Sequence, residues 1–296
     1  MPDFLPFRGT RYRDAPELSS VVAPPYDVID EEERAALEAA DPHNSVRLIL
    51  PRPAPPDDAY AHAAADLAAW LADGVLATDA DDSFYRYEMR FPGDDGTRRT
   101  RGVLGALDLP RTDDTDVLAH ERTLPKARSD RLALLRATRA NLDPIWCLSL
   151  APGLTDLLPD GPPTARATDP SGTEHVITAF GDPASVDAIR QRVAGAPLVI
   201  ADGHHRFETA CTYRDEHPGD PGAARILTFV VELDEATLDV RPIHRLLHHA
   251  PVDLRARLGA VATLEDAGPN TEANVRRLTL EPDARDALLL VDRDGC

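Results

Sequence analysis

A glycine between an apolar strand pattern and a helical pattern constrains the fold of this chain more than any other feature. The apolar run Pro197 to Ala201 predicts a short buried strand, and the segment His204 to Tyr213 predicts a helix. Gly203 permits a sharp turn between them. The first backbone N–H groups of such a helix favour a phosphate or a carboxylate. We therefore predict a unit of the α/β class with an anion-binding turn.

The residues around the glycine strengthen this prediction. His204, His205 and Arg206 stand at the N-terminus of the predicted helix, where positive charge opposes the helix dipole unless an anion binds. Together with Asp202 and Gly203 they form the predicted phosphate-binding motif. The alternative is a charged surface cluster in an ordinary strand-to-helix turn. The sequence pattern leaves both interpretations open.

A second charged cluster lies between residues 120 and 136. His120 and Glu121 offer a general base, and Lys126, Arg131 and Arg136 offer cationic phosphate ligands. All of the 32 basic residues except Lys126 are arginine, and a site that needs a compact ammonium beside a phosphate would keep a lysine. The alternatives are a lysine retained by chance and a solvated, charged helix entry.

A third cluster is the turn from Pro24 to Ile29. Its two prolines keep the backbone extended ahead of a helix that Asp30 and Glu33 open as a capping box. The turn places Tyr26 and Asp27 where they would form the wall of a binding site, with Asp27 as a further candidate catalytic carboxylate. Purely structural turns use the same residue types, so this alternative also stays open.

Direct metal binding has less support in the sequence. His204 and Glu208 are four residues apart and would share one helix face, but no third ligand follows at a telling spacing. We therefore predict Mg²⁺ held through phosphate rather than by the protein alone, with Glu208 as the one candidate ligand.

The remaining periodicity predicts a mixed α/β (α+β) fold in three regions, 1–150, 151–250 and 251–296, with a Pro- and Gly-rich break at 152–170. A hairpin-turn signal at Asp294-Gly295 follows the last predicted strand without a partner strand, so we expect a truncated C-terminal region. Helices are predicted at 30–40, 57–72, 129–140, 184–193, 204–213 and 272–278, and strands at 45–50, 83–91, 100–109, 145–150, 175–180, 197–201, 225–233 and 287–291. The turn residues at 92–96 predict that the strands at 83–91 and 100–109 form a β-hairpin.

Composition limits the class of protein. The net charge of −19 repels polyanions, so nucleic-acid binding would need a local basic patch and is not expected. No stretch has the length and apolarity of a membrane span, and the N-terminus has no apolar signal core. Three widely spaced cysteines argue against a disulfide or zinc framework. We expect a cytoplasmic protein without membrane partners.

Five separated motifs follow one another along most of the chain: Pro25-Tyr26-Asp27-Val28-Ile29, His120-Glu121-Arg122-Thr123, Asp130-Arg131, Leu135-Arg136-Ala137-Thr138 and Asp202-Gly203-His204-His205-Arg206. Taken in order, they resemble the bacterial and archaeal family DUF1015. Its members usually continue beyond this chain's end, which agrees with the expected truncation. The Asp202–Arg206 motif also resembles the phosphate-binding motif of ParB/sulfiredoxin-like proteins, which include free-serine kinases. That resemblance implies a ParB/sulfiredoxin-like core with an additional mixed β-sheet region.

The resemblance implies phosphoryl chemistry on serine, phosphoserine or a related small phosphorylated metabolite, with ATP or ADP and Mg²⁺ as candidate cofactors. In this hypothesis Lys126 and Arg206 neutralise the phosphate, and Glu121 or Asp27 acts as base. His120 and His204 are the alternative nucleophile or general-acid pair. Two rival hypotheses are a nucleotide-binding module without metabolite turnover and a metal-dependent hydrolase.

Overall fold

The computed structural model describes residues 2–13, 17–53, 58–93, 96–110, 115–121, 125–234, 250–280 and 289–291, with the backbone alone at 125–128, 276, 279 and 280. The chain divides into two compact units, Met1–Leu238 and Asp239–Cys296. The first unit carries every described residue of the three predicted clusters. In the described part of the second unit lie two helices, α7 (Leu254–Gly259) and α8 (Glu272–Leu280).

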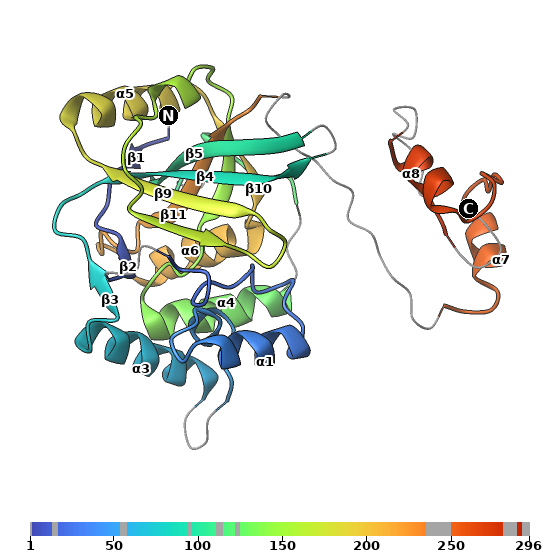
Figure 1. The fold of residues 1–296 in the computed structure, drawn as a ribbon, viewed down its shortest axis with the longest axis horizontal. Helices are drawn as coiled ribbons and strands as arrows, with labels where there is room; N and C mark the ends of the chain where they lie inside the picture. Colours follow the sequence, from blue (N-terminus) through green and yellow to red (C-terminus); the bar gives the residue numbers. More distant parts are fainter. Residues whose placement is uncertain are drawn as a thin grey trace. The chain divides into compact units, whose positions relative to one another are not determined.

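One mixed sheet organises the first unit (Figure 1). Its strand order is β6-β10-β7-β11-β5-β4-β9-β8, with β1 paired to β5, and a separate ribbon joins β2 to β3. The pairs β6–β10 and β7–β11 are parallel, and the others are antiparallel. This confirms the mixed α/β class. The strands are β1 (Phe4–Leu5), β2 (Thr10–Tyr12), β3 (Leu76–Thr78), β4 (Phe84–Gly93), β5 (Gly96–Asp108), β6 (Val117–Leu118), β7 (Ile145–Ser149), β8 (Ala165–Thr168), β9 (Glu174–Phe180), β10 (Leu198–Asp202) and β11 (Arg225–Glu232).

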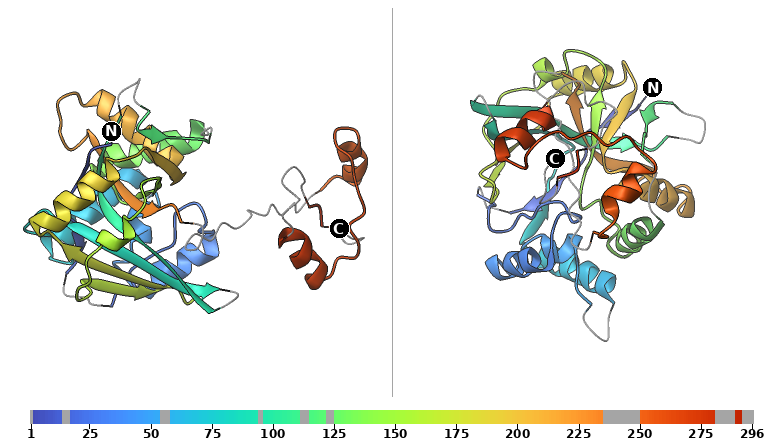
Figure 2. Two further views of the ribbon diagram at one scale, coloured as in Figure 1. Left: turned by 90° about the horizontal axis from the view of Figure 1, so that it is seen from above. Right: turned by 90° about the vertical axis from the view of Figure 1, so that its right-hand side faces the viewer.

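Helices cover the sheet of the first unit in layers, as Figures 1 and 2 show. Helix α5 lies on one side with Ile189 and Val193 fully buried, and α6 packs on the sheet through Phe207 and Ala210. Helix α4 packs on α6, and α3 packs on α4. The helices of this unit are α1 (Glu31–Ala40), α2 (Val46–Ile49), α3 (Ala59–Ala72), α4 (Pro125–Thr138), α5 (Pro183–Val193) and α6 (His204–Glu216), with a 3₁₀ turn at Thr155–Leu157.

Local capping and hairpin signals are confirmed. The Asp30 carboxylate accepts a hydrogen bond from Glu33 N at 2.8 Å, and α1 begins there. Asp58 caps α3 in the same way, through Ala61 N at 2.7 Å. Strands β4 and β5 pair antiparallel from Tyr85 to Gly93, around the predicted hairpin turn. These elements depend on contacts between near neighbours in sequence, which is why local patterns predict them.

The prediction of a strand at 45–50 is wrong. Residues Val46–Ile49 form the short helix α2, because the fully buried Asn44 turns the backbone at this point. The Asn44 side chain accepts from Val46 N at 3.0 Å and donates to Val22 O at 3.1 Å. Ser45 N also donates to Val21 O at 2.7 Å. These contacts with a distant segment override the local preference of an apolar, β-branched run.

The predicted boundary at residue 150 lies inside the first unit. Strand β7 ends at Ser149 and lies between β10 and β11, so the sheet joins residues from both sides of that boundary. The compact units divide between Leu238 and Asp239. The predicted helix at 272–278 is confirmed as part of α8. Of the strand predicted at 287–291, the described residues 289–291 form no strand, and the expected hairpin turn lies outside the described residues.

None of the described helices has both the length and the apolar character needed to cross a membrane.

Candidate functional site

Gly203 makes the turn that begins α6. Its φ is +96°, in the left-handed region that favours glycine. A Cβ at this position would lie 2.8 Å from Ile145 Cγ2 and 3.1 Å from Ile145 Cα, so β7 approaches too closely for any side chain. Both the backbone angle and the packing therefore require glycine. The predicted strand, glycine turn and helix are confirmed.

The N-terminus of α6 lies against the segment that follows β6. Strand β6 pairs parallel with β10, and Leu198 N donates to Asp116 O at 2.9 Å. This pairing brings His120 and Glu121 beside His204. The sequence predicts these two clusters separately. The sheet unites them into one site.

His204 is the buried centre of this site, with its side chain only 4% exposed. Its Nδ1 lies 3.4 Å from Glu121 Oε2, and its Nε2 accepts from His120 N at 3.5 Å. The two imidazole rings of His120 and His204 meet edge-to-face with centroids 4.6 Å apart. Glu121 is 60% exposed, so the buried histidine faces an accessible carboxylate.

The surroundings favour the neutral form of His204. Burial lowers its pKa, and the neighbouring His120 adds to this effect, while Glu121 opposes it. A neutral imidazole has one N–H donor and one acceptor nitrogen. The Glu121 carboxylate fits the donor at Nδ1, and the His120 amide fits the acceptor at Nε2. His204 is therefore suited to hold Glu121 in place.

Arg206 connects the first turn of α6 to the end of β10 and to the residue that precedes β7. Its guanidinium donates to Pro144 O at 2.6 Å and pairs with the Asp202 carboxylate. Asp202 in turn interacts electrostatically with His204 and with Asp143. The pair of His204 and Glu121 and the group around Arg206 therefore belong to one cluster of charged residues.

Asp143 is a site residue that sequence analysis missed. Burial raises its pKa, and the charges of Asp27 and Asp202 add to the shift, whereas Arg206 and Arg131 oppose it. Perturbed carboxylates of this kind cluster at functional sites. No motif flanks Asp143. The one available signal is an acidic residue immediately before Pro144 and a buried strand.

Arg131 joins the predicted Pro24–Ile29 turn to this region. Its guanidinium lies over the ring of Tyr26, 4.0 Å from the ring centroid, and donates to Ile49 O at 2.7 Å. Burial raises the pKa of Tyr26, which interacts electrostatically with Arg131, Asp27 and Arg206. The structure thus brings Asp27 and Arg131 to the site.

Arg136 lies away from the site. Its guanidinium makes two hydrogen bonds to the carboxylate of Glu216, at 2.9 and 2.5 Å. Glu216 is the last residue of α6, about 18 Å along the helix from His204 at 1.5 Å per residue. Arg136 therefore fastens α4 to the far end of α6.

Lys126, His205 and Glu208 complete the predicted set. Lys126 is the second residue of α4, and its side chain lies outside the described residues. His205 is a half-buried neighbour of His204 on α6 and interacts with it electrostatically. Glu208 follows His204 after one helical turn. Among the described side chains, no three His, Cys, Asp or Glu residues converge as a metal site.

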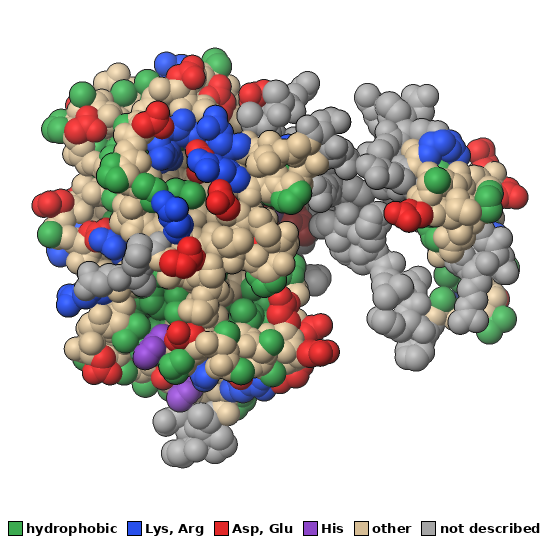
Figure 3. Space-filling model, in the orientation of Figure 1, with side chains coloured by type: hydrophobic (Ala, Val, Ile, Leu, Met, Phe, Trp, Pro, Cys, Tyr) green, Lys and Arg blue, Asp and Glu red, His purple; other side chains and the backbone are tan. Residues whose placement is uncertain are grey.

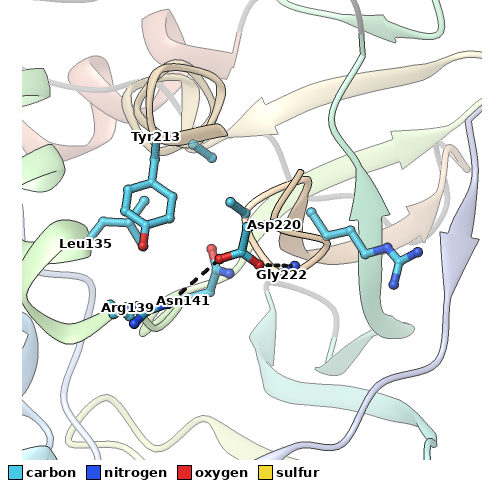
Figure 4. A pocket seen from close by; sticks show the side chains of 9 residues that line it. Leu135, Arg139, Asn141, Tyr213, Asp220 and Gly222 are labelled. Atoms are coloured by element: carbon cyan, nitrogen blue, oxygen red, sulfur yellow. Dashed lines mark hydrogen bonds and ion pairs between the residues drawn. The ribbon is translucent and has the colours of Figure 1, made fainter. Parts of the chain in front are cut away.

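Two cavities lie between α4 and α6. The smaller, about 50 Å³, is lined by Arg131, Asp143 and Arg206 together with apolar side chains, and so adjoins the site. The larger, about 200 Å³, lies toward the C-terminal ends of the two helices, where Tyr213 and Leu135 face Asp220 and Arg139 (Figure 4). None of the predicted site residues lines this larger cavity.

Comparison with known families agrees with the resemblance carried by these motifs. The family model described as "Protein of unknown function (DUF1015)" matches residues 4–295, nearly the whole chain. The chain belongs to the DUF1015 family. The curated proteins and the solved structures contain no significant match.

Proposed function

We propose that this DUF1015 protein is a phosphoryl-transfer enzyme that acts on serine, phosphoserine or a related small phosphorylated metabolite. The observation that carries the proposal is the pair of buried His204 and exposed Glu121 at the glycine turn that begins α6. A phosphate would bind the first backbone N–H groups of α6, because Gly203 at the N-cap has no side chain that could accept hydrogen bonds from them. Such an anion also offsets the unfavourable placement of His205 and Arg206 at a helix N-terminus.

Glu121 is the base in this proposal. Its carboxylate is accessible to a ligand, and His204 orients it from the buried side. A positioned carboxylate of this kind accepts the proton of a substrate hydroxyl or of the attacking water. Because both ring nitrogens of His204 face groups of the 120–121 segment, His204 is the positioning residue rather than the nucleophile.

The charged surface beside this pair suits a ligand with charges of both signs. The guanidinium groups of Arg131 and Arg206 would neutralise a phosphate or a carboxylate. The carboxylates of Asp27, Asp143 and Asp202 would pair with an ammonium group. An amino acid or its phosphate ester combines these groups, which favours serine or phosphoserine as substrate.

A nucleotide would supply the phosphoryl group in the kinase direction. ATP or ADP would carry Mg²⁺ on its phosphates, where the ion neutralises charge, since no described carboxylate cluster forms a cage for it. The likeness of Asp202–Arg206 to the ParB/sulfiredoxin phosphate-binding motif supports this part of the proposal. We extend the proposal to a ParB/sulfiredoxin-like core around β10 and α6.

The test is to incubate the purified protein with serine plus ATP or ADP and, separately, with phosphoserine. Phosphorus NMR would follow phosphoserine formation or phosphate release. We expect turnover that falls sharply in Glu121→Gln and Arg206→Ala and stays unchanged in Arg136→Gln, the matched variant outside the site. Turnover that survives Arg206→Ala at the original rate contradicts the proposed phosphate site. Nucleotide binding without any turnover would instead favour a binding module.

A further inference from the structure

A second charged surface lies on the opposite half of the sheet from β10. Alternation along β4 places Arg86, Glu88 and Arg90 on one face of the sheet. On the neighbouring strand β5, Arg101 lies opposite Glu88, and Arg99 lies opposite Arg90. Figure 3 shows basic side chains gathered over this region of β4 and β5. We call Arg86, Arg90, Arg99 and Arg101 the arginine face. Strands β7 and β11 separate it from the α6 site.

Two members of the arginine face are buried charges. The Arg86 side chain is only 9% exposed and donates to Pro159 O at 2.6 Å and Thr178 Oγ1 at 3.2 Å. The largely buried Arg101 donates to Leu158 O at 2.6 Å. The buried Nε of each has no hydrogen-bond partner among the described residues. Because burying a charge is costly unless it is paired, this arrangement needs an explanation.

A single carboxylate oxygen joins these two guanidinium groups. Asp160 Oδ1 accepts from Arg86 Nη1 at 2.9 Å and from Arg101 Nη2 at 3.2 Å, although the Asp160 side chain is 95% exposed. The donors of two buried cations therefore converge on one oxygen position at the surface. Burial and the charge of Arg86 also lower the pKa of Arg101, which shows how closely the two cations lie.

The charge balance of this surface is opposite to that of the chain. The four guanidinium groups of the arginine face meet three carboxylates. Asp160 is the first, as described above. Glu88 lies 2.7 Å from Arg90 and 3.9 Å from Arg99, and Glu174 lies 3.4 Å from Arg90. The whole chain carries a net charge of −19. A local excess of positive charge within so acidic a protein attracts a small anion to this surface.

We propose that the arginine face is a second anion-binding site, independent of the proposed function, for a compact oxyanion with more than one negative charge, such as a phosphate or pyrophosphate group. The Asp160 carboxylate occupies one oxygen position of that ligand, and binding displaces it. Arg86 and Arg101 hold the ligand from below, and the exposed Arg99 closes on it.

The chemistry of the face favours a compact anion over a nucleic-acid strand. The described side chains in register with Arg86, Glu88 and Arg90 are arginine, glutamate, threonine and valine. The aromatic rings at the next register position, Phe84 and Phe180, pack into the core and offer no open platform on which a base would stack. The charge of the whole chain also repels a long polyanion. A small ligand meets only the local field, because salt screens charges beyond about 8 Å.

The test is calorimetric titration of the full chain with pyrophosphate at fixed ionic strength. Asp160→Asn removes a competing carboxylate from a highly exposed position, so we expect pyrophosphate to bind about fivefold more tightly. Arg99→Gln changes a side chain that is 56% exposed, and we expect about tenfold weaker binding. Asp215→Asn removes an equal charge from a distant exposed site, and Arg52→Gln removes a distant arginine; both should bind as the wild type does.

The outcomes separate this site from the α6 site. Binding that persists in Arg206→Ala and weakens in Arg99→Gln supports the arginine face. Binding that is lost in Arg206→Ala and unaffected by Arg99→Gln and Asp160→Asn overturns it, as does an equal effect of Asp160→Asn and Asp215→Asn. A single-stranded oligonucleotide that binds more tightly than pyrophosphate and depends on Arg99 would replace the compact anion by a nucleic acid.

Discussion

His204 Nδ1 lies 3.4 Å from Glu121 Oε2, and the first residue is buried while the second is exposed. The two come from separate segments that the parallel pairing of β6 and β10 brings together. A buried imidazole that faces an accessible carboxylate can position it without itself contacting a ligand.

If the proposed phosphoryl transfer takes place at this site, Glu121→Gln should abolish most of that activity and leave the fold intact. We expect turnover to fall by about a hundredfold to ten-thousandfold, the range for loss of a general base. The thermal unfolding temperature should change little because the side chain is largely exposed. Glu32→Gln, at an exposed position of α1, serves as the control. An equal loss of turnover in both variants would remove Glu121 from the mechanism.

Stability should depend on pH through His204. Its pKa in the folded chain lies below the ordinary value of 6.5, first through burial and then through His120. The unfolded chain therefore takes up a proton before the folded chain does, so this stability is present above pH 6.5 and is lost as pH falls through the lowered folded pKa. Urea unfolding between about pH 7.5 and pH 5 measures the slope.

His204→Asn removes this titration. The variant should lose less stability than the wild type over the same fall in pH, whereas His62→Asn, at an exposed position of α3, should behave as the wild type does. Parallel pH profiles for wild type and His204→Asn would show that His204 is not the titrating group.

Asp143→Asn should raise stability at neutral pH and lower activity. Burial raises the folded pKa of Asp143 above 3.8, so its contribution to stability is full below that pH and is lost as pH rises through the folded pKa. A neutral amide avoids this loss at pH 7. Each kcal/mol gained raises the unfolding temperature by about 2–4 °C in a domain of this size. Calorimetry and the serine assay on one preparation check both halves, and a variant that is less stable yet fully active contradicts the prediction.

Gly203→Ala should destabilise the chain more than Gly219→Ala does. Both glycines have positive φ, +96° and +89°, so both variants bear the backbone cost of about 1–2 kcal/mol. Only at Gly203 would the new Cβ also clash with Ile145, since nothing lies within 4 Å at Gly219. Denaturant unfolding of the two variants isolates the packing term, and equal losses of stability would mean that β7 yields to the methyl group.

Local sequence patterns predicted most of the elements around the site. Gly203 follows an apolar strand and precedes a helical period, and the structure has this arrangement. The N-cap at Asp30 and the hairpin of β4 and β5 are also local features. Helix α4 begins at Pro125, four residues before the predicted Ser129, since proline suits the first turn of a helix.

The order of the strands and the membership of the site were less accessible to sequence reasoning. Nothing near Asp143 indicates that Asp27 and Asp202 would share its surroundings, because the sheet and the α4–α6 packing bring these residues together. Arg136 belongs to the same charged segment as Arg131, yet it lies five residues further along α4 and pairs with Glu216 instead. The arginine face likewise depends on the register between β4 and β5.

The position of β11 has a consequence for synthesis of the chain. Among the described strands of the sheet, this one is the last to leave the ribosome, yet it lies in the middle, between β5 and β7. A nascent chain that has exposed β5 and β7 but not residues 225–232 presents unpaired strand edges, which are prone to aggregation. The two halves of the sheet therefore depend on a late-arriving central strand to close the gap between them.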